Sequence, residues 1–456
     1  MRLQADINKM NTNKNLFLMS LPIFVELMLQ LLVGNVDQIM VSRVSQTSVA
    51  AIVNANQIMN LVIIVLSMAA TATTVILSQY LGAEDKVNAS RTCMVSMLMI
   101  TVVGVVSTLV VVLGHGSIYR AIRVPEEVVN EASRYLIIVG LFIVVQGLYL
   151  TFSAIIRAFA MMKEIMIVSI VMNVLNIIGN AVLINGWFGL PRLGAIGAAI
   201  STDISKLVGL FLMILLFVKR TDLKLKINLL RPFPTQILKN LCRLAVPSGV
   251  ESLSYNLSQM CILGVVNSFG TLVTVTKGYC SIFANLSYVY ALAIASATQV
   301  VLGYLIGGKH LNLIQKRVNA TNKVAICACV GMAVILYLGS DYIFLMFTDN
   351  PQVLALGKRI LFIEIFLEIG RAVNIVMTKC LIAVGDAVTP TVVGITFQWG
   401  VAFAGAWVFA MIFGWGLEGV WIAMALDECV RGLIYAVHFK KERWKKMFRG
   451  VETEEV

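Results

Sequence analysis

Long apolar runs separated by short polar stretches form the main pattern along this chain. Each run reaches roughly 20 residues, the length that an α-helix needs to cross the hydrocarbon core of a bilayer. We therefore predict twelve membrane-spanning helices. Their expected ranges are residues 16–41, 48–80, 93–114, 130–158, 164–187, 194–218, 243–268, 274–306, 321–340, 354–384, 389–413 and 416–439.

The pattern also repeats itself at a spacing of about 225 residues. Pro22 and Glu26 of the first span correspond to Pro247 and Glu251 of the seventh. The same offset relates Gly82 to Gly307. With slippage of one to three residues, the spacing also relates Pro125 to Pro351, Gly147 to Gly370, Gly194 to Gly416 and Gly197 to Gly419. Two halves of six spans each begin on the same side of the membrane. We therefore expect an axis along the membrane normal to relate them, as in transporters built from parallel repeats.

The predicted fold class is an all-α polytopic membrane protein made of two six-helix lobes with pseudo-two-fold symmetry. We place the N-terminal lobe in residues 1–218, a cytoplasmic interlobe linker in 219–240, the C-terminal lobe in 241–440 and a cytoplasmic tail in 441–456. The linker carries six basic residues and one acidic residue. Its simplest interpretation is an amphipathic tether on anionic lipid.

Composition and charge agree with a membrane protein. Hydrophobic residues make up 59% of the chain and charged residues 13%, and the mean hydropathy is +0.87. These values exclude a water-soluble protein. Lys and Arg gather on the side of the expected termini, so both termini are predicted to be cytoplasmic in the cell inner membrane or plasma membrane. The net charge of +12 then reflects topology and not nucleic-acid binding.

Motifs for enzymatic or metal chemistry are missing from the sequence. The eight cysteines and three histidines form no ligand spacing, and there is no Walker loop or nucleophile elbow. We therefore expect no enzyme and no cofactor. The energy for transport would come from a gradient of Na⁺ or H⁺.

Polar residues inside the spans are the candidates for function, because an ionisable group in the bilayer is costly. Asp37 lies toward the outer end of the first span, where it could bind Na⁺, hold a proton or cap the next segment. Asn173, Asn176 and Asn180 lie on one stripe of the fifth span. That stripe could supply oxygens to a cation or hydrogen bonds between helices, and spacing alone does not choose. Asp203 of the sixth span is expected to pair with Lys206.

Several segments resemble the multidrug and toxic compound extrusion (MATE) family of prokaryotic type. The resemblance rests on Pro22 with the segment 34–37 (GNVD), on 78–83 (SQYLGA), on Asn176 and Asn180 ahead of 194–202 (GAIGAAIST), and on 381–386 (LIAVGD). It covers the whole chain. It implies a twelve-helix antiporter that exports amphipathic, often cationic, compounds in exchange for Na⁺ or H⁺ by alternating access.

The resemblance also implies a cation site in the N-terminal lobe. The matching positions are Asp37, Asn176, Asn180 and Thr202. Relatives of this branch carry an aspartate where this chain has Asn180, so the site keeps its oxygens but loses one charge. The resemblance implies that these four residues bind Na⁺.

Departures also occur in the C-terminal half. Another branch has a glutamate where this chain has Tyr255, and an acid stands at Glu251 instead. Glu368 and Arg371, with Asn374 beyond them, match a Glu-x-Gly-Arg signature and could form a clamp or a switch. Glu26 and Glu251 each lie four residues after a proline. Two roles remain as alternatives for them: gating at the inner ends of the lobes, or hydrogen bonding between helices.

Two other functions compete with export. A flippase for lipid-linked saccharides or peptidoglycan precursors would need cations in its cavity, and only Arg371, Lys206 and Arg431 fall well within spans. A non-transporting receptor does not need duplicated bundles with intramembrane acids. We expect a monomer whose partners are a drug-like small molecule and membrane lipid, without nucleic acid.

Overall fold

A computed structural model describes residues 10–42, 46–189 and 191–447, and these residues contain helices but no strand. For residues 32–39, 42, 185, 188, 446 and 447 it describes the backbone alone. The helices of the first half are α2 (Asn13–Ser42), α3 (Gln46–Gly82), α4 (Lys86–Ala121), α5 (Glu126–Leu141), α6 (Ile143–Ala158), α7 (Met162–Asn185) and α8 (Gly194–Arg220). A short turn, η1 (Trp187–Gly189), lies between α7 and α8.

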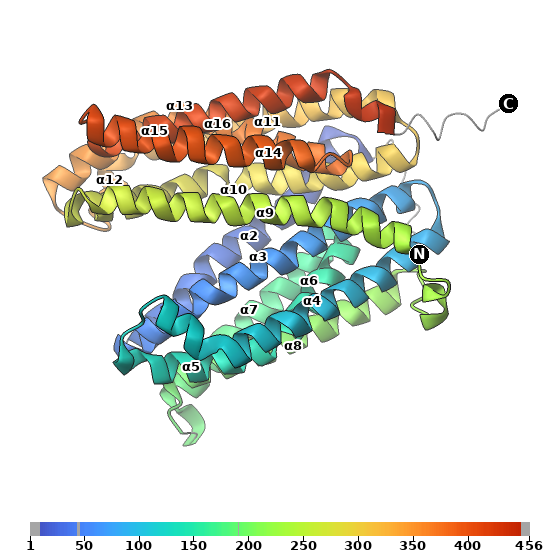
Figure 1. Ribbon diagram of the computed structural model, residues 1–456, viewed down its shortest axis with the longest axis horizontal. Coiled ribbons are helices and arrows are strands. Elements are labelled where there is room, and N and C mark those ends of the chain that lie inside the picture. The colour runs from blue at the N-terminus through green and yellow to red at the C-terminus, as the bar shows by residue number, and fades with distance from the viewer. Residues whose placement is uncertain (1–9, 43–45, 190, 448–456) are drawn as a thin grey trace. The chain divides into compact units, whose positions relative to one another are not determined.

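The second half follows the same plan (Figure 1). Its long helices are α9 (Thr235–Asn267), α10 (Thr271–Gly307), α11 (Leu311–Leu338), α13 (Pro351–Ala383) and α16 (Gly416–Lys440). One further run joins α14 (Val388–Phe397), the π-helical turn η3 (Gln398–Phe403), α15 (Ala404–Trp407) and a second π turn, η4 (Val408–Ile412). The short elements are η2 (Ile227–Leu230), α12 (Ser340–Leu345) and η5 (Arg443–Met447).

Each of the twelve predicted spans coincides with a helix or a helical run. Among the described residues, eight helices are long and apolar enough to cross a membrane, and the pair α5–α6 makes a ninth if it counts as one span. The helices α9, α13 and α16 are 33, 33 and 25 residues long. Polar and charged side chains interrupt their apolar runs, and these side chains form the site described below.

Two predicted spans differ from regular helices. The fourth span, expected as one helix, bends by 46° between α5 and α6. At the bend, the Phe142 amide bonds to Val139 three residues back, which tightens the turn. The eleventh span contains the two π turns, in which the hydrogen-bond ladder shifts from i+4 to i+5. Neither feature is encoded in the hydrophobic pattern.

The chain forms two compact units, one of residues 25–245 and the other of residues 246–456 together with the segment that ends at Phe24. The predicted N-terminal lobe began at residue 1, so the first part of α2 is grouped differently in the structure. Its contacts explain why. Arg317 donates to the Asn11 carbonyl at 3.0 Å and to the Asn13 side chain at 2.5 Å, and Phe24 packs edge-on against Tyr290.

The connection between the two halves is shorter than the predicted linker of residues 219–240. Helix α8 continues to Arg220 and α9 begins at Thr235, so residues 221–234 connect them. Polar first and last turns extend these helices past the apolar runs from which the spans were predicted. The predicted tail lies partly outside the described residues, since residues 448–456 are not described.

Each unit has apolar cores of its own. In residues 25–245, one core surrounds Ile52, Ile100 and Leu136, and a second surrounds Phe152 and Phe217. In the C-terminal unit, one core surrounds Phe283, Phe344 and Trp421. Many large apolar side chains are exposed, among them Leu113, Leu338 and Leu433. Exposed side chains of this kind are what a bilayer solvates.

The internal duplication appears in the detailed geometry of each unit. Thr73 donates to Ser96 at 2.9 Å, and the equivalent pair Thr298 and Thr321 lies at 3.0 Å. Gly194 and Gly416 both have φ of +55° at the start of the last span of each half. A side chain there would be strained. The sequence repeat is thus a repeat of local structure.

Gly197 and Gly419 mark an equivalent close approach of helices in the two units. A Cβ atom on Gly197 would lie 2.8 Å from the carbonyl carbon of Leu183, and one on Gly419 would lie 2.8 Å from that of Phe409. Backbone atoms cannot move aside as a flexible side chain can. Only glycine therefore permits α8 to pack on α7, and α16 on η4, at this distance.

We predict that Gly197→Ala and Gly419→Ala each destabilise the protein by about 2 kcal/mol, because the added methyl group overpacks a backbone contact. Gly331→Ala in α11 is the matched control, since nothing lies within 4 Å of its Cβ position. Apparent melting temperatures in detergent measure the effect. Equal melting temperatures for all three variants would contradict the close approach.

Candidate functional site

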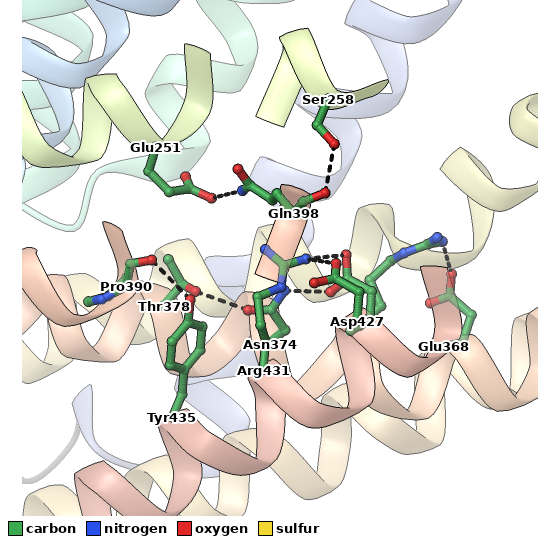
Figure 2. A network of polar contacts seen from close by, with 12 residues as sticks. Glu251, Ser258, Glu368, Asn374, Thr378, Pro390, Gln398, Asp427, Arg431 and Tyr435 are labelled. Carbon is green, nitrogen blue, oxygen red and sulfur yellow. Dashed lines mark hydrogen bonds and ion pairs between the residues drawn. The ribbon is translucent and has the colours of Figure 1, made fainter. Parts of the chain in front are cut away.

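A network of polar and charged side chains lies inside the C-terminal unit (Figure 2). Four helical elements contribute to it: α9, α13, α16 and the π turn η3. The side chains are Glu251, Asn374, Gln398, Asp427, Glu428 and Arg431, of which all but Glu251 are buried. Because buried groups are shielded from bulk solvent, each of them depends on the others for hydrogen bonds.

Arg431 is the centre of the network. Its Nη2 atom donates to Asp427 Oδ2 at 2.6 Å and lies 3.0 Å from Glu428 Oε1. Both acids can reach Arg431 on α16, because Asp427 lies four positions and Glu428 three positions before it. Asn374 of α13 donates to the other oxygen of Glu428, and Thr378 donates to Asn374 at 3.3 Å.

Glu251 joins α9 to the π turn. Gln398 Nε2 donates to Glu251 Oε1 at 2.7 Å, and the Ser258 hydroxyl donates to the Gln398 carbonyl at 2.9 Å. Trp399 donates to Ser254 at 3.0 Å. A π turn presents its side chains and carbonyls differently from an α-helix, and such turns are frequent at functional sites. Here the turn directs an amide, and not a base, at the carboxylate.

A second charged group lies along α13. Arg371 Nη1 donates to Glu364 Oε1 and to Glu368 Oε1, each at 2.6 Å. Trp421 Nε1 donates to the other oxygen of Glu364 at 2.7 Å. The Arg371 guanidinium also stands 5.0 Å from the centre of the Tyr288 ring, a cation–π contact. The predicted contact between Glu368 and Arg371 is confirmed, and Glu364 adds a second acid to it.

The two groups together contain more acids than bases. Five carboxylates face two guanidinium groups: Glu251, Glu364, Glu368, Asp427 and Glu428 against Arg371 and Arg431. Within the described residues, Asp427 Oδ1 and Gln398 Oε1 are buried without a hydrogen-bond partner. Uncompensated negative charge in a low-dielectric interior is costly. The arrangement can therefore hold protons or attract a cation.

The repeat-equivalent acids Glu26 and Glu251 have different partners. Glu26 forms an ion pair with Arg157 of α6 at 2.9 Å, and its side chain is almost fully buried. Glu251 instead accepts from the Gln398 amide. The first acid is thus paired with a cation within its own unit, whereas the second accepts hydrogen bonds from the neutral groups of Gln398 and Ser252.

Three of the four residues of the predicted N-terminal cation site come together between α7 and α8. Asn176 Nδ2 donates to Thr202 Oγ1 at 3.1 Å, and Asn180 Nδ2 donates to Asn176 Oδ1 at 3.4 Å. Asp37 is part of α2, but its side chain lies outside the described residues. The amide stripe therefore forms a hydrogen bond between α7 and α8 and one within α7.

The sequence analysis missed three acids and one amide of these networks: Glu364, Asp427, Glu428 and Gln398. The spacing of Glu364, Glu368 and Arg371 on α13, and of Asp427, Glu428 and Arg431 on α16, is a detectable signal for an intramembrane ion pair. Gln398 has no such signal, because the π turn orients it. Tyr255, a predicted substrate residue, is 38% exposed on α9.

The expected pair between Asp203 and Lys206 is not formed as a hydrogen bond. The Asp203 side chain is 2% exposed, and neither carboxylate oxygen has a hydrogen-bond partner among the described residues. Asp203 follows Thr202 on α8, and successive helical residues differ by about 100° in direction, so the two side chains leave the helix on different sides. It is a further buried acid of this unit.

Residues 22–182 and 247–423 match the sequence model of the MatE family, and the two matched segments correspond to the two halves of the repeat. The chain belongs to the MatE family. It is 34% identical to the uncharacterized transporter YisQ of Bacillus subtilis over 94% of each chain. It is 24% identical to the probable multidrug resistance protein NorM of Thermotoga maritima, over 97% of this chain and 95% of that relative.

Solved structures agree with this assignment to the MatE family. A crystal structure of MATE in the bent conformation superposes with a TM-score of 0.89 at 18% identity, over 98% of this chain and all of the other. An outward-facing multidrug resistance MATE transporter gives a TM-score of 0.88 at 20% identity, with the same coverage. The likeness establishes the twelve-helix, two-lobe fold. MatE proteins are membrane transporters and not enzymes.

We predict that Arg371→Met is far more harmful than Glu368→Gln. Loss of the guanidinium leaves Glu364 and Glu368 facing each other without compensation, which costs roughly 3–5 kcal/mol. Loss of the Glu368 charge leaves the Arg371–Glu364 pair intact. Yield and melting temperature of the purified variants measure the difference. The reverse order would show that Arg371 does not stabilise the group.

Proposed function

We propose that this MatE-family transporter is a secondary active antiporter that exports small amphipathic cations in exchange for Na⁺ or H⁺ by alternating access. The observation that carries the proposal is the surplus of buried carboxylates in the C-terminal unit. A fixed negative charge in a low-dielectric site attracts a positively charged substrate far more strongly than it would in water.

We assign the two units different tasks. The N-terminal site of Asp37, Asn176, Asn180 and Thr202 is proposed to bind the coupling ion, because carboxylate, amide and hydroxyl oxygens suit a hard cation and a carboxylate can also take a proton. The C-terminal group around Glu251 is proposed to attract the substrate. Tyr255, exposed on the same helix as Glu251, offers an aromatic ring for an organic cation.

The partners of the two intramembrane arginines favour export over lipid flipping. A flippase for pyrophosphate-linked lipids needs cations that are free to meet phosphate oxygens. Arg371 and Arg431 are instead each held by two carboxylates. Relatives described as probable multidrug resistance proteins support the same choice.

The coupling assignment is tested in proteoliposomes that contain a fluorescent organic cation, with a Na⁺ gradient or a pH gradient imposed separately. We predict that one of the gradients drives transport in the wild type and that Asp37→Asn abolishes this drive, because it removes both the charge and the exchangeable proton. Asn180→Asp, which adds the charge that the family resemblance implies at this position, should tighten Na⁺ binding if Na⁺ is the ion.

Glu127→Gln is the control for this experiment, since it removes one carboxylate at an exposed position at the start of α5. It should transport as the wild type does. Ion-driven transport that persists in Asp37→Asn would move the coupling site to the C-terminal unit. Failure of both gradients in the wild type would refute the antiporter itself.

A further inference from the structure

Each half of the chain follows its last span with the same short pattern. Residues 219–224 read KRTDLK and residues 440–445 read KKERWK. Both segments contain a basic pair, an acid, an apolar residue and a lysine in this order. We call residues 219–226 the first basic strap and residues 440–445 the second basic strap. The duplication has thus preserved a motif outside the membrane spans.

The apolar residue of each strap packs back onto its own unit. Leu223 is 8% exposed and joins the core that contains Phe217. Trp444 is 4% exposed, stacks on Phe439 with a centroid distance of 5.5 Å, and donates its Nε1 hydrogen to the Phe439 carbonyl at 3.2 Å. Each strap is therefore held against the end of its helix, and its charged side chains have a defined place.

The charges that the straps present are positive. Exposed basic side chains are Lys219, Arg220, Lys224 and Lys226 in the first strap, and Lys440, Lys441 and Arg443 in the second. The acids are already engaged, since Asp222 lies 3.8 Å from Lys86 and Glu442 lies 2.7 Å from Lys445. No carboxylate of the described residues forms an ion pair with the exposed basic side chains of the first strap. The exposed basic side chains of the first strap can therefore bind an external anion.

Exposed apolar side chains follow the first strap. Ile227 is 72% exposed and Phe233 is 40% exposed, both in the connection between α8 and α9. Lysines beside exposed apolar side chains are typical of segments that lie in the membrane interface, with the apolar groups at the acyl boundary and the charges among the headgroups. Each strap begins at the last residues of a predicted membrane span, α8 or α16. The end of a span lies near the lipid headgroups, so we place the straps at that level.

We propose that the two basic straps bind anionic phospholipid headgroups, one set for each unit. The partner is the phosphate of a lipid surface, because seven exposed basic side chains and two exposed apolar side chains match both parts of an anionic lipid. Each Lys or Arg near such a surface adds to the attraction within about a Debye length. On the predicted topology, both straps face the cytoplasmic leaflet.

The full-length chain in mild detergent provides the test. Native mass spectrometry counts the molecules of phosphatidylglycerol and of phosphatidylcholine, with identical acyl chains, that remain bound. We expect an excess of phosphatidylglycerol in the wild type. The first-strap variant Lys219→Gln/Arg220→Gln/Lys224→Gln/Lys226→Gln should lose roughly half of this excess, and Lys440→Gln/Lys441→Gln/Arg443→Gln should lose the other part.

The matched control is Arg120→Gln/Arg123→Gln/Arg134→Gln/Arg192→Gln, which removes the same charge from exposed residues predicted to lie on the outer side. It should keep the phosphatidylglycerol excess, and melting temperatures confirm that all variants are folded. An excess that is unchanged in both strap variants would overturn the proposal. An equal loss in the control would also overturn it, since net charge alone would then explain the effect. Binding of an acidic soluble protein without any lipid excess would assign the straps to a different partner.

Discussion

The arrangement of buried charge in the C-terminal unit is the constraint on which the rest of the structure depends. A carboxylate taken out of water needs a cation or hydrogen-bond donors, and the two polar groups of this unit contain two arginines for five acids. The groups that meet this need are the charged and polar side chains that interrupt the apolar runs of α9, α13 and α16. It also explains the donors around the acids: Trp421, Asn374 and Gln398 each give a hydrogen to a carboxylate.

Duplication followed by divergence accounts for the different properties of the two units. The halves keep equivalent hydroxyl pairs, glycine contacts and left-handed helix starts. They differ in the partners of their equivalent acids. Glu26 forms an ion pair with Arg157, whereas Glu251 accepts a hydrogen bond from the neutral Gln398 amide. One common scaffold can thus hold a neutral, locked end in one unit and a negatively charged group in the other.

The sequence predicted most of the fold because bilayer thickness and hydrophobicity determine span length. It also predicted the Glu368–Arg371 contact, since residues three apart share a helix face. The bend at Phe142 and the π turn at Gln398 depend on packing between helices, which local patterns do not encode. The grouping of the first part of α2 with the C-terminal unit depends on long-range contacts of Arg317 and Tyr290. The site was accordingly predicted in part, with the residues along one helix found and their partners across helices missed.

The most direct test of the central claim is the equilibrium binding of an organic cation, such as tetraphenylphosphonium, to the purified protein. Our account predicts that Glu251→Gln weakens this binding by about tenfold, equivalent to roughly 1.4 kcal/mol, because one uncompensated charge is lost while the hydrogen-bonding shape is kept. An uncharged compound of similar size should bind equally to both proteins, and Glu127→Gln should bind the cation as the wild type does. Equal affinity of the wild type and Glu251→Gln for the cation would contradict the account.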